Sequence, residues 1–292
     1  MNTRAVEAAT YKALGQRVQV LTPVVTRGFT AALGWQGTLA DGTSVFIKSA
    51  DQPYVREKLE REIAFCGQYH APFIPALLGT AREGDTVVFI HEDITGSWPP
   101  PWDDAMIPQV SDCLATVATY PAPDLPTIEA TQPMRRWKNV VRKDYDVPAL
   151  AGVPRTWLEA AIPTLLALEN QAVLEGTHLV HLDLRAGNIC ITGHGVVLID
   201  WDHASRGSDT IDRMMWLVNL YLEGGPKPWE QLFCDIAVLS VLAGFFADDS
   251  AGPNPAGLDP AVRLLQAKQC AIALEWLRHV TALPALPSAR SI

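Results

Sequence analysis

Along the first ninety positions, short apolar runs are separated by turn residues, a pattern that predicts a β-sheet. Asp41-Gly42 lies between two β-rich runs and is typical of a two-residue hairpin turn. A second turn is expected at 83–85, and a short amphipathic helix or an ordered arm at 5–14 precedes the first strand. The sequence therefore predicts a five-stranded antiparallel sheet, with strands near 18–25, 33–39, 44–49, 73–78 and 86–91.

The segment 53–69 has the apolar spacing of an amphipathic helix, and one acidic side chain falls on its apolar stripe. That side chain is Glu62, whereas Glu57 and Glu60 point away from the stripe. A buried carboxylate without a partner is costly, and Lys48, at the end of an apolar strand, is the available cation. The pattern predicts a Lys48–Glu62 ion pair, the alternative being a Glu62 at the solvent rim. The stripe consists of Val55, Leu59, Ile63, Cys66 and Tyr69.

Beyond residue 94 the pattern changes from strands to helices. The segment 94–102, ITGSWPPPW, breaks all regularity, so we expect an N-lobe at 1–94 and a C-lobe at 95–292. The predicted fold class is α+β and bilobal, with a sheet and one helix in the first lobe and mostly helices in the second. The helices expected in the second lobe are 105–120, 156–175, 214–222, 229–246 and 260–280.

The stretch 178–202 combines two carboxylates with an amide. Two β-rich runs around a turn at 193–195 predict a hairpin, which returns Asp200 to the loop that carries Asp183 and Asn188. Carboxylate and amide oxygens are ligands for Mg²⁺, and a carboxylate free of metal can accept the proton of an attacking hydroxyl. The alternative is structural, with Asp183 and Asn188 capping a turn and Asp200 ending a strand.

These residues stand in the order H-x-D-x-x-x-x-N followed by D-W-D, and in this the chain resembles the aminoglycoside phosphotransferase family of the protein-kinase-like superfamily. The resemblance implies a bilobal kinase fold, ATP or GTP as phosphate donor, and Mg²⁺ as cofactor. It implies that Lys48, braced by Glu62, holds the nucleotide phosphates and that Asp183 positions the acceptor hydroxyl. Asn188 and Asp200 would be the metal ligands.

The same resemblance implies further residues around the site. His181 and Asp212 would be structural neighbours of the catalytic loop. Arg185 would either contact a phosphate oxygen or form a structural ion pair, and Leu182 stands where many relatives have glycine or asparagine. The expected nucleotide contacts are Gly28, Phe29 and Thr30 after the first strand, and His91, Glu92, Asp93 and Ile94 at the lobe boundary, where the acidic pair is otherwise an ordinary linker.

The acceptor implied by the resemblance is a hydroxylated small molecule. We infer a kinase that phosphorylates an antibiotic, aminoglycoside-like or nucleoside-type, and thereby confers resistance. The alternatives are a kinase for a metabolite such as a sugar or choline-like alcohol, and a non-catalytic nucleotide-binding pseudokinase. A protein kinase is disfavoured because no A-P-E segment follows Asp200. Candidate acceptor residues are Asp202, Trp98, Trp102 and Glu223. The carboxylates Glu223, Asp248, Asp249 and Glu275 are available for substrate amines, although the favoured interpretation of each is an ordinary surface charge.

Composition and charge narrow the class of partner. The 292-residue chain is 48% hydrophobic and carries a formal net charge of −9, which argues against nucleic acid as a partner. Its five cysteines include no C-x-x-C pair, as expected for free thiols in a reducing compartment. The N-terminal segment lacks the apolar core of a signal peptide, and no window suits a membrane span. We expect a cytoplasmic protein, a monomer or weak homodimer, that binds no membrane.

Overall fold

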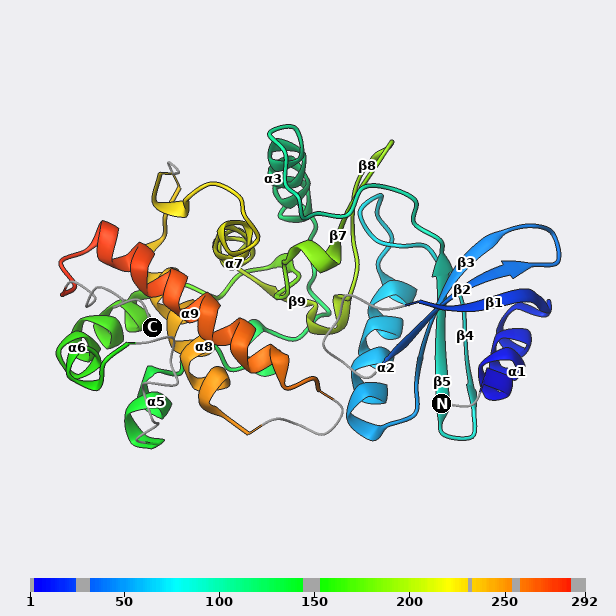
Figure 1. Ribbon diagram of the computed structural model, residues 1–292, viewed down its shortest axis with the longest axis horizontal. Coiled ribbons are helices and arrows are strands. Elements are labelled where there is room, and N and C mark those ends of the chain that lie inside the picture. Colours follow the sequence, from blue (N-terminus) through cyan, green and yellow to red (C-terminus); the bar gives the residue numbers. More distant parts are fainter. Residues whose placement is uncertain (1–2, 25–31, 144–152, 231–232, 254–257, 285–292) are drawn as a thin grey trace. The chain divides into compact units, whose positions relative to one another are not determined.

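The computed structural model describes residues 3–24, 32–143, 153–230, 233–253 and 258–284, and the chain divides into two compact units (Figure 1). The first unit is built mainly from Met1–Pro99 and Gly187–Ala204. The second is built mainly from Pro100–Ala186, Ser205–Asn254 and Pro260–Ile292. The predicted α+β class is confirmed, because the first unit contains a large sheet and the second is mostly helical. No helix within the described ranges is long and apolar enough to cross a membrane.

The first unit contains the predicted five-stranded antiparallel sheet, with the strand order β1-β2-β3-β5-β4. The turn at Asp41-Gly42 joins the second strand to the third. Gly42 has a φ of +88°, which glycine adopts without steric strain. The strands are β1 (Val18–Val24), β2 (Leu33–Leu39), β3 (Ser44–Ala50), β4 (Leu77–Glu83) and β5 (Thr86–Glu92).

The two faces of this sheet are covered by different helices (Figure 1). The helix α1 (Thr3–Leu14) packs on one face, and α2 (Pro53–Gln68) packs on the other. Successive side chains of a strand point to opposite faces, so Ile47 lies in the core beneath α1 while Lys48 reaches α2. The core beneath α1 consists of Val6, Ala9, Trp35, Leu39, Val45, Ile47, Val88 and Ile90.

The fourth strand begins later than the sequence predicts. The expected strand at 73–78 is wrong, because β4 is Leu77–Glu83 and Phe73 lies outside any strand, although it is buried. The Phe73 ring lies 6.1 Å from the Trp201 ring, and its carbonyl accepts a hydrogen bond from the Leu198 amide at 2.9 Å. An apolar run that packs against a distant segment has the same local pattern as a buried strand.

The hairpin predicted after the catalytic stretch is present as β7 (Ile189–Thr192) and β8 (Gly195–Leu198). Ser97 and Ile191 exchange backbone hydrogen bonds of 2.8 and 2.9 Å, which attach the hairpin to the segment after β5. Gly96 permits this approach, because a Cβ there would lie 2.5 Å from the Ile191 carbonyl oxygen. The hairpin therefore belongs to the first unit, although it follows residue 95 in the chain. The lobe boundary between residues 94 and 95 stays a prediction.

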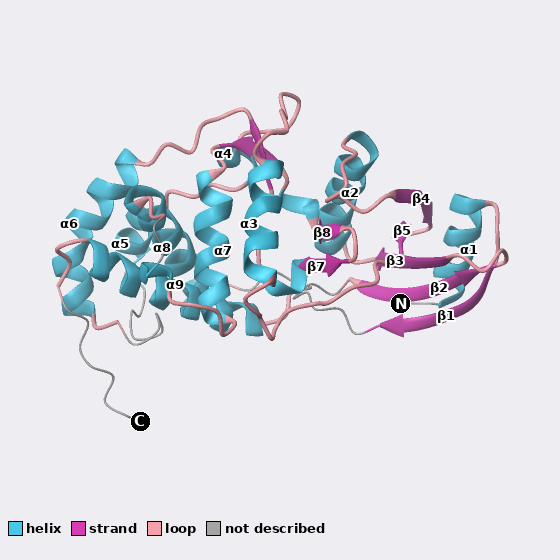
Figure 2. Ribbon diagram, turned by 90° about the horizontal axis from the view of Figure 1, so that it is seen from above, coloured by secondary structure: helices cyan, strands magenta, loops and turns pink. Residues whose placement is uncertain are grey.

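The second unit consists mostly of helices (Figure 2, cyan). Its α8 (Ile236–Ala251) is buried throughout residues 238–248. The predicted helix at 229–246 is wrong in its first turns, because Asp235 accepts hydrogen bonds from two amides of the next turn and so caps the helix. The other elements are α3 (Met106–Val117), α4 (Ile128–Thr131), α5 (Trp137–Lys143), α6 (Arg155–Gln171), α7 (Thr210–Leu222), α9 (Ala261–Val280) and the pair β6 (His178–Val180) and β9 (Ser205–Gly207).

Candidate active site

Lys48 on β3 lies at the centre of a buried ionic cluster in the first unit. Its Nζ donates to both carboxylate oxygens of Glu62, at 2.8 and 2.9 Å, so the ion pair predicted from the helix pattern is present. The same ammonium donates to the carboxylate of Asp200, in the segment after β8. Glu62 also accepts a hydrogen bond from the Asp200 amide at 3.1 Å. A strand, a helix and a loop thus meet at one ammonium group.

This cluster sets two carboxylates against one ammonium. Burial alone would lower the pKa of Lys48, but the charges of Asp200 and Glu62 outweigh burial and raise that pKa, so the lysine stays protonated. Burial raises the pKa of Glu62 to about 7, against the attraction of Lys48. The neighbouring Asp200 carboxylate repels Glu62 and adds to that rise. A second cation beside Asp200 would relieve this repulsion.

Asn188 and Asp200 have the chemistry and placement that suit a divalent cation. The Ile199 amide donates to the Asn188 carbonyl at 3.0 Å, so the residue before Asp200 pairs with Asn188. The Asp200 side chain is 31% exposed. Within the described ranges, no three His, Cys, Asp or Glu side chains are grouped to hold a metal by themselves. Mg²⁺ does not require such a group, because it binds through one or two carboxylates together with substrate phosphates.

Asp202, a predicted acceptor residue, is buried and ion-paired within the first unit. Its Oδ2 lies 2.5 Å from Nζ of Lys58 on α2. Burial alone would raise the pKa of Asp202, but the positive charges of His203 and Lys58 outweigh it and lower that pKa. Lys58 and Glu62 are four residues apart and lie on one face of the helix. The helix α2 therefore holds both aspartates of the D-W-D segment.

His91, a predicted nucleotide contact, is buried near the end of β5. Its ring centroid lies 5.2 Å from that of Phe46 and 5.2 Å from that of Phe89. Burial, with the nearby Lys48 charge, lowers the pKa of His91 to about 3. The imidazole is therefore neutral near pH 7. Since the side chain is also buried, His91 would contact a nucleotide through its backbone.

The remaining predicted nucleotide contacts differ in their surroundings. Glu92 accepts a hydrogen bond from the Ala76 amide at 3.3 Å, and Asp93 accepts one from the Gln36 side chain at 2.6 Å. Ile94 is partly exposed. Glu92 is the last residue of β5, and Asp93 and Ile94 follow it. Recognition of the nucleotide base by the backbone of this segment stays a prediction. Gly28, Phe29 and Thr30 lie outside the described residues.

The loop that carries Asp183 belongs to the second unit and is strained at Leu182. Leu182 has a φ of 63°, a left-handed conformation that costs a non-glycine residue about 1 kcal/mol. Asp212 on α7 accepts hydrogen bonds from the amides of His181 and Leu182, at 2.6 and 2.8 Å. The Asp183 amide donates to Nδ1 of the buried His181 at 3.2 Å. These contacts fix the backbone before Asp183, whose side chain is 35% exposed.

Arg185 and Glu223 hold the same loop beyond Asp183. Nε of Arg185 lies 3.5 Å from Oδ2 of Asp183, so the structural ion pair, one of the two predicted possibilities, is present. Both carboxylate oxygens of Glu223 accept from the Ala186 amide, at 2.9 and 3.1 Å. Burial raises the pKa of Glu223, against the effects of this amide, the Trp102 indole and the Arg185 charge. Trp102 and Glu223, two predicted acceptor residues, both belong to the second unit.

The sequence profile of the phosphotransferase enzyme family, APH, matches residues 34–260, which is most of the chain. The chain belongs to this family. It is a phosphotransferase of the APH type, as the resemblance of its H-x-D-x-x-x-x-N and D-W-D motifs predicted. A search of curated protein sequences gave no significant match.

Solved structures of small-molecule kinases are similar to this APH-family chain in fold. Aminoglycoside phosphotransferase APH(4)-Ia has a TM-score of 0.63 at 12% identity, covering 96% of this chain and 100% of its own. A putative fructosamine-3-kinase from Thermobifida fusca YX-ER1 has a TM-score of 0.59 at 17% identity, covering 94% and 100%. Macrolide 2'-phosphotransferase type I has a TM-score of 0.54 at 18% identity, covering 98% and 97%. The predicted protein-kinase-like bilobal fold is confirmed.

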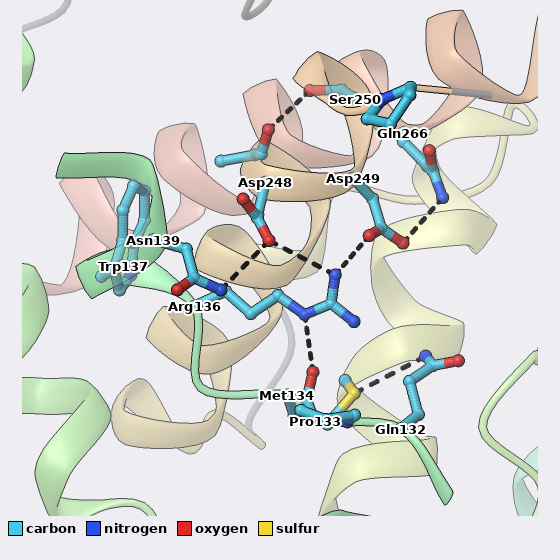
Figure 3. Close-up of polar contacts among 12 residues, drawn as sticks. Gln132, Pro133, Met134, Arg136, Trp137, Asn139, Asp248, Asp249, Ser250 and Gln266 are labelled. Atoms are coloured by element: carbon cyan, nitrogen blue, oxygen red, sulfur yellow. Dashed lines mark hydrogen bonds and ion pairs between the residues drawn. The ribbon is translucent and has the colours of Figure 1, made fainter. Parts of the chain in front are cut away.

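In this phosphotransferase, two of the carboxylates considered for substrate amines are bound internally (Figure 3). The Arg136 guanidinium lies 3.4 Å from Asp248 and also donates to Asp249. Asp248 accepts a further bond from Asn139 at 3.3 Å, and Asp249 accepts one from Gln266 at 3.2 Å. Asp248 is only 4% exposed, and its hydrogen bonds connect α8 to Asn139 on α5 and to Arg136 just before it. The expectation of a surface charge is therefore wrong for this residue.

Glu275, Trp98 and Trp102, which were also considered for acceptor binding, take no part in the hydrogen bonds drawn around Arg136. Glu275 lies 2.5 Å from Arg278 and 3.2 Å from Nε2 of His279, on the same helix α9. Trp98 is partly exposed and belongs to the first unit, whereas Trp102 belongs to the second. Their contacts with an acceptor stay predictions.

Two neighbours of the site escaped the sequence analysis, although the helical period contains a signal for each. Lys58 precedes Glu62 by four residues and shares its face of α2. Asn219 follows Asp212 by seven residues and shares its face of α7. Lys58 pairs with Asp202 and Asn219 binds Leu184, both on distant segments. The helical spacing therefore identifies these residues as neighbours of the site only once the partners are known.

Proposed function

We propose that this APH-family phosphotransferase transfers the γ-phosphate of ATP or GTP to a hydroxyl of an antibiotic, aminoglycoside-like or nucleoside-type. The observation that carries the proposal is the Lys48–Glu62–Asp200 cluster of the first unit. Lys48, braced by Glu62, would hold the nucleotide phosphates, and Asn188 and Asp200 would hold Mg²⁺. The metal would neutralise charge on the transferred phosphoryl group.

Asp183 would orient the acceptor hydroxyl and accept its proton. The loop around it supports this role, because its backbone is fixed by Asp212 while the carboxylate is partly exposed. The Arg185 guanidinium, 3.5 Å from Oδ2 of Asp183, further restricts the position of this carboxylate. Catalysis of this type depends mostly on positioning and on charge neutralisation.

An antibiotic acceptor is supported by similarity of fold. A structure of APH(4)-Ia with a TM-score of 0.62 to this chain is a ternary complex with ADP and hygromycin B. The macrolide 2'-phosphotransferase is a second similar structure whose name includes an antibiotic class.

A metabolite acceptor, such as a sugar or choline-like alcohol, is the second candidate. The carboxylates Asp248, Asp249 and Glu275 all face internal cations, and Glu223 binds a loop amide. Because these carboxylates already bind groups of the protein, they are less available to substrate amines. An acceptor with few amines is therefore favoured over a polycationic one. The similar fold of a putative fructosamine-3-kinase is consistent with this candidate.

The experiment that tests the proposal measures phosphate transfer by mass spectrometry, with ATP and GTP as donors. The acceptor panel contains aminoglycosides, macrolides, nucleoside antibiotics, simple sugars and choline. We expect one acceptor to gain one phosphate, and Asp183→Ala to lower kcat by about a hundredfold or more while Kd for Mg–nucleotide stays near the wild-type value. Asp112→Ala, on an exposed position of α3, is the control and should leave the rate unchanged.

Three outcomes are distinguishable. Transfer to an antibiotic that requires Asp183 supports a resistance kinase. Transfer only to a metabolite keeps the mechanism and replaces the acceptor. Tight Mg–nucleotide binding without transfer to any compound would contradict the proposal and indicate a nucleotide-binding protein without catalysis.

A further inference from the structure

The catalytic loop is held by three polar side chains from one face of α7. Asp212 and Asn219 lie on α7 and Glu223 is its C-cap, and their spacings of seven and four residues place them within about 40° of one another around the helix. Asp212 binds two amides before Asp183, and Glu223 binds the Ala186 amide after it. The third side chain, Asn219, binds between these points.

Asn219 makes a hydrogen bond to the residue that follows Asp183. Its Nδ2 donates to the Leu184 carbonyl at 2.7 Å, and the side chain is 1% exposed. The Asn219 Oδ1 accepts in turn from Nε2 of Gln269 on α9, also at 2.7 Å. Gln269 is 4% exposed, so this relay from α9 through α7 to the loop lies in the interior.

The buried Asn219 amide needs both of its hydrogen-bond partners, and through one of them it restricts the backbone after Asp183. Buried polar groups must be hydrogen-bonded, and both ends of the Asn219 amide are satisfied only if Leu184 and Gln269 keep their places. Fixing the Leu184 carbonyl restricts the backbone on the carboxyl side of Asp183, as Asp212 restricts it on the amino side. The left-handed Leu182 persists only while such contacts over-determine the loop.

We propose that Asn219 is a positioning residue for Asp183, with Gln269 fixing the orientation of its amide. This inference rests on the proposed function, in which Asp183 handles the acceptor proton. Asn219 acts through the Leu184 carbonyl and touches neither nucleotide nor acceptor. Its effect therefore falls on kcat, while the KM for the nucleotide, which depends on the first unit, stays near its wild-type value.

The test compares Asn219→Leu with a matched control, Ser240→Ala. Ser240 is also fully buried in the second unit, and its hydroxyl donates to a backbone carbonyl, Leu165, at 2.8 Å. We expect Asn219→Leu to lower kcat by about tenfold or more with a nearly unchanged KM for ATP. In hydrogen exchange of the full chain, the peptide covering 181–187 should exchange about tenfold faster than in Ser240→Ala.

The outcomes separate this inference from the proposed function. If the wild type is active and Asp183→Ala inactive, but Asn219→Leu matches Ser240→Ala in kcat and in exchange of 181–187, the positioning role is overturned. If no acceptor is found, the exchange comparison alone decides the role. Should Asn219→Leu not fold, Gln269→Leu is measured instead, and wild-type exchange of the loop peptide in that variant overturns the proposal.

Discussion

Leu182 and Asp200, both non-glycine residues with positive φ, adjoin groups proposed for catalysis. Leu182 precedes Asp183 with φ 63°, and Asp200 itself has φ 65°. Residues in this region cost free energy and persist where surrounding contacts hold them, which occurs most often at functional sites. Here the contacts are specific, because Asp212 binds the Leu182 amide and Glu62 binds the Asp200 amide. Both strained residues are therefore held through their amides by buried carboxylates.

His91 makes the first unit less stable as the pH falls. Its pKa in the folded chain is lowered to about 3, so below pH 6.5 the unfolded chain takes up a proton that the folded chain does not. The free energy of unfolding should decrease by about 1.6 kcal/mol between pH 6.5 and pH 5 through this group. In His91→Gln this part of the decrease should disappear, as measured by urea unfolding at both pH values.

The control for this prediction is His70→Gln, at an exposed position of the same unit. It should retain the wild-type decrease between the two pH values. An equal decrease in His91→Gln and wild type would show that His91 is protonated in the folded chain.

At the scale of elements, α2 is fixed by the D-W-D segment as much as by the sheet. Phe65 of α2 stacks on Trp201 with ring centroids 4.7 Å apart, while Lys58 and Glu62 bind the flanking aspartates. The apolar spacing of the helix predicted that Ile63 is buried, whereas Phe65 is buried and Ile63 is partly exposed. A second face of the helix is buried because Trp201 packs against it. The apolar period of the helix predicts only the face that packs on the sheet.

Lys58 should contribute measurably to stability through Asp202. The two side chains are 16% and 10% exposed, so Lys58→Met removes the lysine of a buried ion pair and leaves the Asp202 carboxylate beside His203, 3.5 Å away. We expect a loss of about 3 kcal/mol in the free energy of unfolding, measured by urea denaturation. The double variant Lys58→Met/Asp202→Asn should recover part of this loss, since the uncompensated charge is then absent.

Arg61→Met is the matched control on the same helix. Arg61 pairs with Glu57 at 3.2 Å, but both side chains are largely exposed, and such pairs contribute about 0.5 kcal/mol or less. Equal effects of Lys58→Met and Arg61→Met would contradict a special role for the buried pair.

At the scale of the whole molecule, the first unit is discontinuous in sequence. Residues 187–204 join it through the Ser97–Ile191 bridge, the Trp201 stack and the bond between Lys48 and Asp200. The chain thus leaves this unit after residue 99, forms about half of the second unit, and returns at residue 187. The proposed metal ligands return with it, so completion of the phosphate-binding cluster requires contacts between residues 138 and 152 positions apart in sequence.

A fragment of residues 1–99 should therefore fail to fold cooperatively by itself. It lacks Trp201, which is 1% exposed, and leaves Lys48 and Glu62 without Asp200. Joining residues 187–204 to the fragment through a flexible linker should restore a cooperative urea transition, and the same fusion with Trp201→Ala should not. A cooperative transition in the 1–99 fragment alone would show that the return segment is dispensable.

The sequence by itself determined the features that follow from local period and local chemistry. Four of the five strands of the sheet, the amphipathic α2 and the spacing of Asp183, Asn188 and Asp200 are all readable within short windows. The Lys48–Glu62 pair was also predictable, because a carboxylate on an apolar stripe needs a cation and few candidates exist.

Only the tertiary structure decided which distant groups these residues meet. From the sequence, Asp202 was predicted to contact the acceptor and Asp248 to be a surface charge. In the structure Asp202 pairs with Lys58 of α2, and Asp248 is buried beside Arg136. The run at 73–78 had the pattern of a strand, yet Phe73 is buried because Trp201 returns to it. The physical reason is common to all three: burial and ion pairing depend on what the folded chain brings to a residue, and a sequence window contains only one of the partners.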